Sequence, residues 1–379
     1  MSAPVEEALA ERIARSGSVR FDEFMDLALY GPGGFFRAGG GAGGRGGDFL
    51  TSPEVGPLFG AVVARYLDAR WEDLGRPDPF VVVEAAAGRG ALALAVLAAA
   101  PRCAPALRYL LVETSTELRE RQAEHLALVH PFEVLGPTPD PEAEGGPVPA
   151  PDAGTGPLCC SLLELPAQPV VGVVLANELL DNVPMRLLEF GDGGWSEVRV
   201  TADGGRLREL LVPAAADVDR RARELVPAAT TGARIPLQER AADWVGRALG
   251  VLERGTLVVI DYAVPDTAGL AGRPAGEWLR TYRGHQRGGG PLEAPGEQDL
   301  TVEVAVDQLP APDSDRDQAS WLRAAGIEEL VEEGRRTWSA SAGVGDLAAL
   351  RARSRVAESE ALCDPAGLGA FRVLEWSVG

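Results

Sequence analysis

The chain has 379 residues, which is long enough for one large domain or two modest ones with a buried core. Its formal net charge of -20 argues against nucleic acid and anionic membranes as main partners. Four cysteines without a Cys-x-x-Cys pair and only three histidines argue against a structural metal site and a disulfide framework, so we expect a cytoplasmic protein with reduced thiols. The oligomeric state stays open, a homodimer included.

The first residues, Met1 to Ala14, carry several acids and no long apolar run, which argues against a signal peptide. No apolar run in the chain reaches the roughly 18 residues of a membrane-spanning helix. Instead, Val5 to Ala14 and Phe21 to Leu29 have the pattern of short amphipathic helices. The glycine-rich stretch Gly39 to Gly47 is expected to form a mobile loop.

The next segment, Thr51-Ser52-Pro53-Glu54, has the composition of a helix N-terminus. Thr51 or Ser52 can cap the helix, Pro53 fits its first turn, and Glu54 favours the positive end of the helix dipole. The apolar spacing that follows predicts a helix to about Leu74. Two interpretations remain open: a capped core helix, or a rigid helix end that covers a ligand together with the glycine loop.

A buried strand is predicted at Phe80 to Val83, and Glu84 closes it. A turn of small residues with Ala86, Gly88 and Gly90 follows, and strong helix formers come after it. Strand, tight turn and helix in this order are typical of the nucleotide-binding half of a doubly wound α/β sheet. The small residues let backbone N–H groups approach a ligand at the helix N-terminus.

Acids at two successive strand ends indicate which ligand binds. Glu84 would repel a dinucleotide pyrophosphate, which argues against an NAD-dependent oxidoreductase, and it suits the ammonium and sulfonium of S-adenosylmethionine. A second strand, Leu107 to Val112, ends in Glu113, whose carboxylate can accept hydrogen bonds from ribose hydroxyls. The glycines alone are also compatible with an ordinary strand–helix turn, but both acids together favour a cofactor site.

The middle of the chain is less regular. A helix is predicted from Ser115 to Leu128 and a weak strand from Phe132 to Leu135. Gly136 to Pro157 is rich in proline, glycine and acids, so we expect a disordered or loosely held loop. The short strand that follows carries Ser161 and Leu162, which would fall where a third strand end approaches an adenine ring.

The next buried strand, Val170 to Leu175, runs into Asn177, Glu178 and Asp181. The strand ends at one edge of such a sheet collect the chemistry. Glu178 and Asp181 are three residues apart, so in a helical turn they would face the same way. Two carboxylates there would hold a cationic acceptor or take a proton from one, and a capped turn with solvated acids is the alternative.

A β-rich segment comes next. Met185 to Phe190 and Trp195 to Val200 form a predicted hairpin, and Leu207 to Val212 adds a third strand. A helix is predicted from Pro236 to Leu249, and a β-branched strand from Thr256 to Ile260. The three strands indicate an insertion beside the active edge.

The last third of the chain begins with a loop-like region, Thr281 to Asp307, that is rich in functional side chains. Its His285 is either a base or a surface histidine without a role. A helix is predicted from Asp317 to Ala325, and Ile327 to Val331 and Phe371 to Trp376 are predicted as the last two strands.

These patterns occur together in one known family. The chain resembles the MidA-like family of S-adenosylmethionine-dependent methyltransferases, bacterial relatives of a mitochondrial complex I assembly-factor arginine methyltransferase. The matching stretches are Asp48 to Glu54, Glu84 to Gly90, Asn177 to Pro184, Ile260 to Tyr262, and Pro295 to Thr301. Together they are specific, because the Thr-Ser-Pro-Glu and Asn-Glu-x-x-Asp pieces have no reason to co-occur in an unrelated sheet.

The resemblance implies an α/β fold: the Rossmann-like seven-stranded class I methyltransferase sheet, with an N-terminal helical extension and a β-rich insertion. It implies S-adenosylmethionine as cofactor and, from the mitochondrial branch, methyl transfer to a protein arginine. It also favours the lid interpretation of Thr51 to Glu54. The family usually has Gly-x-Gly-x-Gly where this chain has Ala86, Gly88 and Gly90. Ala86 therefore adds a methyl group where a positive φ or close ligand approach favours glycine, and two consequences stay open: weaker cofactor binding or a slightly shifted cofactor pose.

The resulting domain prediction has four parts: an N-terminal helical and lid region (1–78), the cofactor-binding half of the core (79–184), the inserted substrate-side β element (185–235) and the C-terminal half of the core (236–379). The expected catalytic residues are Asn177, Glu178 and Asp181, and Asn177 is also expected to contact the cofactor. Two other functions stay open, a small-molecule O- or N-methyltransferase of secondary metabolism and a non-catalytic assembly factor on the same fold.

Overall fold

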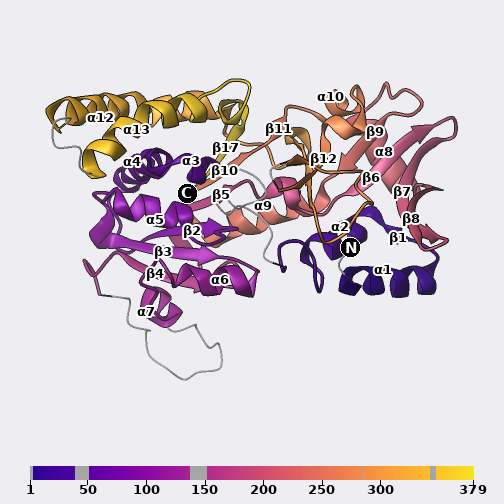
Figure 1. Cartoon of the computed structure of the whole chain (residues 1–379), viewed down its shortest axis with the longest axis horizontal. Helices are drawn as coiled ribbons and strands as arrows, with labels where there is room; N and C mark the ends of the chain where they lie inside the picture. The colour runs from indigo at the N-terminus through magenta and orange to yellow at the C-terminus, as the bar shows by residue number, and fades with distance from the viewer. Residues whose placement is uncertain (1–2, 39–50, 137–151, 285, 342–346) are drawn as a thin grey trace. The chain divides into compact units, whose positions relative to one another are not determined.

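The computed structural model describes residues 3–38, 51–136, 152–284, 286–341 and 347–379. Contacts between residues divide the chain into two compact units (Figure 1). Unit 1 consists of Met1–Leu50, Glu178–Gly246 and Asp261–Ala311, and unit 2 consists of Thr51–Asn177, Arg247–Ile260 and Pro312–Gly379. Among the described residues, no helix combines the length and the apolar character that crossing a membrane requires.

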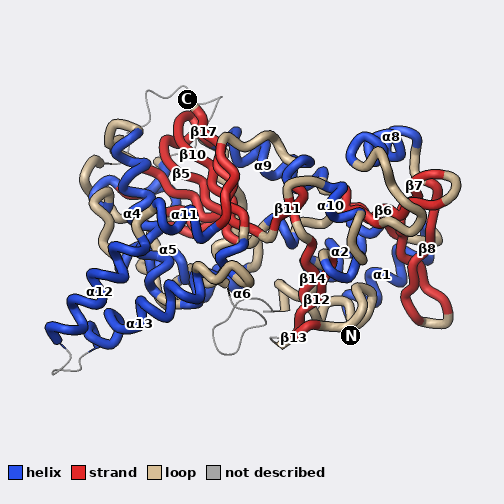
Figure 2. The backbone as a smooth tube through the Cα atoms, turned by 90° about the horizontal axis from the view of Figure 1, so that it is seen from above, coloured by secondary structure: helices blue, strands red, loops and turns tan. Residues whose placement is uncertain are grey.

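A mixed sheet of seven strands forms the centre of unit 2. In spatial order its strands are β16 (Ser314–Asp317), β17 (Arg372–Val378), β10 (Leu252–Asp261), β5 (Val170–Asn177), β2 (Phe80–Ala85), β3 (Leu107–Val112) and β4 (Leu158–Leu162). The five strands from β10 to β4 are parallel, whereas β16 and β17 are antiparallel to each other. Figure 2 shows β17, β10 and β5 side by side. Because parallel strands end at the same edge, the residues that follow β2, β3, β4, β5 and β10 share one edge of the sheet.

Burial explains why these segments form strands. All six residues of β2 and all six of β3 are buried, as expected for strands of a parallel sheet covered on both faces. The helices of unit 2 are α3 (Ser52–Val55), α4 (Pro57–Asp73), α5 (Ala91–Ala98), α6 (Thr116–Gln122), α7 (Pro131–Leu135), α11 (Gln318–Ala324), α12 (Ile327–Ser341) and α13 (Leu347–Leu362). Helix α4 packs closely on α5, since a Cβ atom on Gly60 would lie 2.3 Å from the Cβ atom of Ala95. Helices α12 and α13 pack against each other and against α4 (Figure 1).

Unit 1 is built around a five-stranded sheet with the order β1-β7-β6-β9, in which β8 pairs with β7. These strands are β1 (Val19–Arg20), β6 (Arg186–Gly191), β7 (Gly194–Asp203), β8 (Arg206–Pro213) and β9 (Arg234–Leu237). The remaining elements are helices α1 (Ala3–Ser16), α2 (Phe21–Tyr30), α8 (Ala216–Leu225) and α10 (Thr267–Ala271), and the short strands β11 (Ala263–Val264), β12 (Leu279–Arg283), β13 (Gln286–Arg287), β14 (Asp299–Val302) and β15 (Val304–Ala305). A hydrophobic cluster that includes Phe21, Phe24 and Trp278 forms its core. Helix α9 (Glu239–Val251) spans the division between the two units.

Most elements expected from the sequence are present. The mixed α/β class, both N-terminal helices, the β6–β7 hairpin with β8, and the strands that lead into Glu84, Glu113, Ser161 and Asn177 are confirmed. The four-part division of the chain stays a prediction. Gly39 to Gly47 and His285 lie outside the described residues, as do residues 137–151 of the expected loop.

Two expected strands are wrong. Phe132 to Leu135 lies in the short helix α7, where the His130 side chain accepts a hydrogen bond of 3.2 Å from the Phe132 N–H and Pro131 occupies the first turn. Ile327 to Val331 begins helix α12, and β16 is the edge strand in its place. In both cases a short apolar run did not distinguish a strand from one turn of a helix.

Other elements also differ from expectation, and the helix expected from Ser115 to Leu128 ends at Gln122. The helix expected from Ser52 to Leu74 is interrupted at Gly56. Pro236 belongs to β9, so the next helix begins only at Glu239. The loop-like region from Thr281 to Asp307 contains strand residues of β12 to β15, because pairing between distant segments supplies the order that its glycine-rich sequence lacks.

Candidate functional site

The glycine-rich turn between β2 and α5 has a left-handed backbone at alternate residues. The φ angles of Ala86, Gly88 and Gly90 are +54°, +53° and +79°. A Cβ atom on Gly90 would lie 2.7 Å from Leu126 Cδ1, so a side chain at this position would require the Leu126 side chain to shift, whereas the space around a Cβ on Gly88 is open. Ala86 therefore adopts the positive φ expected at the first position, and its methyl group is exposed.

Glu113, directly after β3, is tied to this turn. Its Oε2 accepts a hydrogen bond of 3.0 Å from the Gly88 N–H, and its Oε1 accepts one of 2.8 Å from the Ser115 N–H. The Gln122 side chain donates to the Gly88 carbonyl at 2.8 Å, so both backbone groups of Gly88 are held by side chains. Burial raises the pKa of Glu113, and the backbone hydrogen bonds oppose that shift.

Glu84 lies in the core rather than on the surface of the turn. It is 5% exposed, and its Oε2 accepts a hydrogen bond of 2.7 Å from the Tyr109 hydroxyl. Burial raises the pKa of Glu84 to about 7, while hydrogen bonds from Tyr109 and from the backbone of Ala93 oppose the shift. Glu84 thus joins β2, β3 and α5, and direct contact between its carboxyl group and a cofactor stays a prediction.

Thr51 to Glu54 lies beside the glycine-rich turn. Glu54, on α3, and Arg89, in the turn, form an ion pair with 3.9 Å between Oε1 and Nη2. The buried Ser52 hydroxyl donates to Gln318 Oε1 at 3.1 Å, which fixes α3 on α11. Thr51 is the N-cap residue of α3, although its side chain makes no capping hydrogen bond.

The C-terminal end of β4 lies next to Glu113. The Leu162 carbonyl accepts a hydrogen bond of 3.0 Å from the Glu113 N–H. The Ser161 hydroxyl accepts one of 3.2 Å from Arg119 Nε, and Ser161 and Leu162 are both half-buried. Residues at the ends of β2, β3 and β4 therefore form one connected group in unit 2.

The end of β5 does not have the expected helical turn. Asn177 pairs with Ile260 in the sheet, Glu178 has a left-handed backbone with φ of +54°, and a 3-10 turn begins only at Leu180. The expectation that Glu178 and Asp181 share a helical face is therefore wrong. Glu178 is half-buried, whereas Asp181 is only 3% exposed.

The carboxyl group of Asp181 is one of a cluster of acids. Burial raises the pKa of Asp181 well above its ordinary value, and the charges of Asp261, Asp299 and Glu178 raise it further. The Oδ1 atom of Asp181 is buried and has no hydrogen-bond partner among the described residues.

The turn after β5 also has contacts that no sequence pattern predicted. The Asn182 side chain donates to Asp299 Oδ1 at 2.9 Å, and the Tyr30 hydroxyl donates to the Asn182 carbonyl at 3.1 Å. Asp261 accepts hydrogen bonds from the turn that contains Asp181. The position of Asp261 at a strand end was a usable signal, but nothing local identified its partners. Arg89 was not among the predicted site residues either, although a cationic side chain in a turn of small residues was a usable signal.

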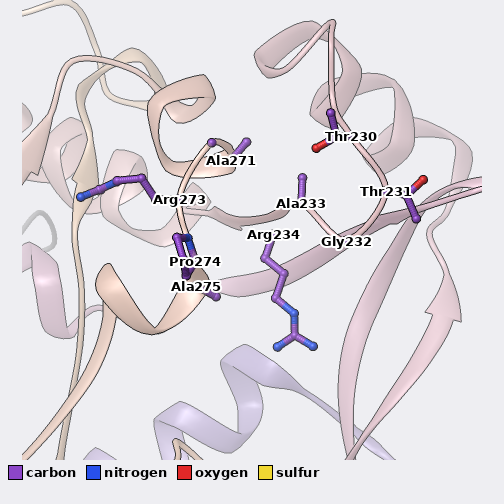
Figure 3. A pocket seen from close by; sticks show the side chains of 10 residues that line it. Thr230, Thr231, Gly232, Ala233, Arg234, Ala271, Arg273, Pro274 and Ala275 are labelled. Atoms are coloured by element: carbon purple, nitrogen blue, oxygen red, sulfur yellow. The ribbon is translucent and has the colours of Figure 1, made fainter.

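A pocket of about 430 Å³ lies elsewhere in unit 1, and none of the expected site residues lines it (Figure 3). It is lined by the loop from Thr230 to Arg234 and the segment from Ala271 to Ala275. The Arg234 guanidinium is already engaged by Glu189 at 2.7 Å and by Glu209 at 2.6 Å.

Comparisons with known proteins identify the family. Residues 62–322 match the family described as "Putative S-adenosyl-L-methionine-dependent methyltransferase". The chain belongs to this family. The resemblance noted from the sequence is thereby confirmed, and the protein is an S-adenosylmethionine-dependent methyltransferase.

Two curated relatives of this methyltransferase are mitochondrial proteins. It is 29% identical over 309 residues to the protein arginine methyltransferase NDUFAF7 homolog of Drosophila melanogaster, a match that covers 78% of this chain and 67% of the relative. It is 27% identical over 357 residues to protein arginine methyltransferase NDUFAF7 of Danio rerio, which covers 86% of this chain and 77% of the relative.

A solved structure supports the cofactor. A Burkholderia thailandensis protein crystallised with S-adenosyl-homocysteine is 27% identical, with a TM-score of 0.77, and the match covers 99% of this chain and 92% of that one. S-adenosyl-homocysteine is what S-adenosylmethionine becomes on losing its methyl group. The cofactor expected from Glu84, the glycine-rich turn and Glu113 is therefore confirmed for the methyltransferase.

Proposed function

We propose that the methyltransferase modifies an arginine side chain of a protein, and that Glu178 orients the guanidinium of this acceptor. The observation that carries the proposal is the end of β5, where a half-buried carboxylate lies among buried acids. Asp181, Asp261 and Asp299 surround the same turn. A negative cluster favours a cationic acceptor over a neutral small molecule. The names of the relatives support the same acceptor class.

The cofactor site would be formed by the connected group in unit 2. We infer that Glu113 contacts the ribose, that Gly88 and Gly90 allow close approach, and that Ser161 and Leu162 border the adenine. The open space beside Gly88 suits this role. Its N–H already donates to Glu113, so close approach rather than hydrogen bonding to the ligand is the function of the turn.

The rest of the expected cofactor contacts come from the ends of two other segments. Thr51, Ser52, Pro53 and Glu54 would cover the ligand, with the Glu54–Arg89 ion pair joining this cover to the turn. Asn177, the last residue of β5, would border the methionine end. We infer that the seven-stranded sheet is the class I methyltransferase sheet and that β6 to β8 form an insertion in it.

The bound cofactor supplies a methyl group that its sulfonium already activates. The task of the protein is therefore to position the acceptor and to exclude water. The Glu178 carboxylate pairs with the guanidinium and fixes the direction of one nitrogen. That nitrogen would form its new bond to the methyl carbon as the carbon–sulfur bond breaks, with the electron pair staying on sulfur. The nitrogen would give up a proton, which Glu178 would accept.

The test compares cofactor binding with turnover. We expect Glu178→Gln to lower the rate of methyl transfer to arginine-containing acceptor peptides by about 100-fold, within the range of a lost general base. Binding of S-adenosyl-homocysteine, measured by calorimetry, should change by less than about threefold. Mass spectrometry of the products should find the methyl group on arginine.

The control variant is Glu253→Gln, an exposed acid near the beginning of β10 that should leave both quantities unchanged. Equal losses of turnover and of cofactor affinity in Glu178→Gln would contradict the assignment of Glu178. Methylated products that carry no methylarginine would contradict the acceptor class.

A further inference from the structure

The carboxylate of Asp261 binds the backbone of a distant turn. Asp261 is the last residue of β10 and is 1% exposed. Its Oδ2 accepts hydrogen bonds from three consecutive N–H groups, those of Leu179 at 3.2 Å, Leu180 at 2.7 Å and Asp181 at 3.3 Å. Its Oδ1 accepts a fourth, from the Tyr262 N–H at 2.8 Å. One side chain thus holds the first turn after β5 from a position about 80 residues later in the chain.

This turn is the one that presents Glu178. The residue has a left-handed backbone, which a side chain with a Cβ atom adopts only at a cost in energy. Such a conformation persists only when the surroundings impose it. The N–H groups that Asp261 binds belong to the three residues directly after Glu178, so the Asp261 carboxylate fixes the chain at the point where the left-handed residue ends.

The opposite side of the turn is held as well. The Tyr30 hydroxyl donates to the Asn182 carbonyl at 3.1 Å, and the Asn182 side chain donates to Asp299 Oδ1 at 2.9 Å and to the Leu300 carbonyl at 3.2 Å. The turn therefore has fixed contacts at its beginning and at its end. Asp261 supplies those next to Glu178, and Asn182 supplies those farther along.

We propose that Asp261 is a positioning residue for methyl transfer, which holds Glu178 in its left-handed conformation through the Leu179–Asp181 N–H groups. It acts through Glu178 and does not touch the acceptor. This inference rests on the proposed function, because it takes Glu178 as the group that orients the acceptor. Loss of the carboxylate lets the backbone relax, and the Glu178 side chain then leaves the direction that the reaction needs.

The kinetic test is a double-mutant cycle of Asp261→Ala with Glu178→Gln. We expect Asp261→Ala alone to lower kcat for an arginine-containing peptide by about 10- to 100-fold, with S-adenosyl-homocysteine affinity within about threefold of wild type. In the Glu178→Gln background the same change should lower kcat by less than about threefold, because the group that Asp261 positions is already lost. Equal factors in both backgrounds would overturn the proposal.

A stability cycle tests the same contact without any activity. Glu178→Gly removes the strain of the left-handed residue, so we expect it to raise the unfolding midpoint of the wild type and not that of Asp261→Ala. An equal shift in both backgrounds would overturn the proposal. If the stability cycle shows coupling but no arginine peptide is methylated, arginine is not the acceptor, whereas the contact between Asp261 and the turn after Glu178 is supported.

Two further variants keep the result interpretable. Asp261→Asn retains one acceptor oxygen, so it should retain more of the activity than Asp261→Ala. If the alanine variant does not fold, Asp261→Asn replaces it in both double-mutant cycles. Asp266→Asn is the matched control, because Asp266 caps α10 by accepting a hydrogen bond of 2.7 Å from the Gly269 N–H. A loss in Asp266→Asn as large as in Asp261→Asn would show a general effect of lost caps and would overturn the proposal.

Discussion

Glu113 Oε2 accepts a hydrogen bond of 3.0 Å from the Gly88 N–H, which ties the acid after β3 to the glycine-rich turn after β2. The same carboxylate supports the turn, and we propose that its remaining acceptor capacity binds the cofactor ribose. Replacement of Glu113 should consequently affect cofactor binding through both roles.

We expect Glu113→Ala to weaken S-adenosyl-homocysteine binding by at least about tenfold, which corresponds to about 1.4 kcal/mol. Glu113→Gln should have an intermediate effect, because its amide keeps one acceptor oxygen. Isothermal titration calorimetry measures both. The control is Glu117→Ala, a half-buried acid on α6 that pairs with Arg121 at 2.6 Å. Unchanged affinity in Glu113→Ala would refute the ribose assignment.

Ala86 occupies a left-handed position, with φ of +54°, which favours glycine. Such a backbone costs a residue with a Cβ atom about 1–2 kcal/mol, and glycine in turn costs roughly 0.5–1 kcal/mol of extra entropy. We therefore expect Ala86→Gly to leave the free energy of unfolding unchanged or to raise it by up to about 1 kcal/mol. The affinity for S-adenosyl-homocysteine should be retained or improved.

The neighbouring Ala87 provides the contrast. It is 6% exposed, and its φ is not positive. Ala87→Gly should lower the free energy of unfolding by about 1 kcal/mol, since it loses a buried methyl group and adds chain entropy in the unfolded state. Denaturant titration of the two variants measures the difference, and a larger loss for Ala86→Gly than for Ala87→Gly would contradict the strain at Ala86.

Glu84 should make stability depend on pH. Burial raises its pKa to about 7 in the folded protein, whereas the ordinary value is about 4.3. The folded state then binds this proton more tightly, so its contribution to stability is complete below about pH 4.3 and is lost as the pH rises towards 7. The glutamine in Glu84→Gln cannot ionise. Between about pH 4.3 and 7 the free energy of unfolding of this variant should therefore fall less steeply than that of the wild type, by up to about 1.4 kcal/mol per pH unit.

Denaturant unfolding at several pH values between about 4 and 8 measures this difference between wild type and variant. A second variant checks the cause. The Tyr109 hydrogen bond lowers the pKa of Glu84, so Tyr109→Phe should move the decline to higher pH. Parallel stability curves for wild type and Glu84→Gln would rule out the shifted pKa.

Glu358 on α13 should be important for stability. Its Oε2 accepts a hydrogen bond of 2.8 Å from the buried Leu58 N–H in the first turn of α4, and its Oε1 accepts one of 2.5 Å from the Ser354 hydroxyl. Glu358→Ala leaves the Leu58 N–H without its acceptor, so we expect a loss of about 1–3 kcal/mol in the free energy of unfolding. Glu360→Ala, an exposed position on the same helix, is the control.

Gly56→Ala tests this contact from the other side. A Cβ atom on Gly56 would lie 2.3 Å from the Cδ atom of Glu358, so the carboxylate would have to move away from α4. Thermal unfolding should show a lower midpoint for Gly56→Ala and for Glu358→Ala, and less than the summed effect when both are combined. Additive shifts would mean that the two residues act independently.

Local sequence was sufficient for the parallel strands and for the acids at their ends. The run before Glu84 is apolar and β-branched over a strand length, and the run before Glu113 is mostly apolar. Burial on both faces of a parallel sheet leaves this signature in the sequence itself. The run of small residues predicted a tight turn at Ala86, Gly88 and Gly90. These predictions needed no knowledge of distant contacts.

Local sequence did not decide whether short apolar segments form strands or helices. Phe132 to Leu135 and Ile327 to Val331 have apolar residues that suit a strand or a helix equally, and packing chose the helix in both. Next to the break at Gly56, the Leu58 N–H likewise donates to the Glu358 carboxylate, which comes 300 residues later.

The sequence by itself determined which residues stand at the strand ends, because strand periodicity and chain order are local properties. Only the tertiary structure decided what these residues contact. Glu84 bonds to Tyr109 inside the core, Glu54 meets Arg89, and Asp261 binds the turn after Glu178. Hydrogen bonds and burial depend on distances in space between segments far apart in the chain, and no local pattern encodes those distances.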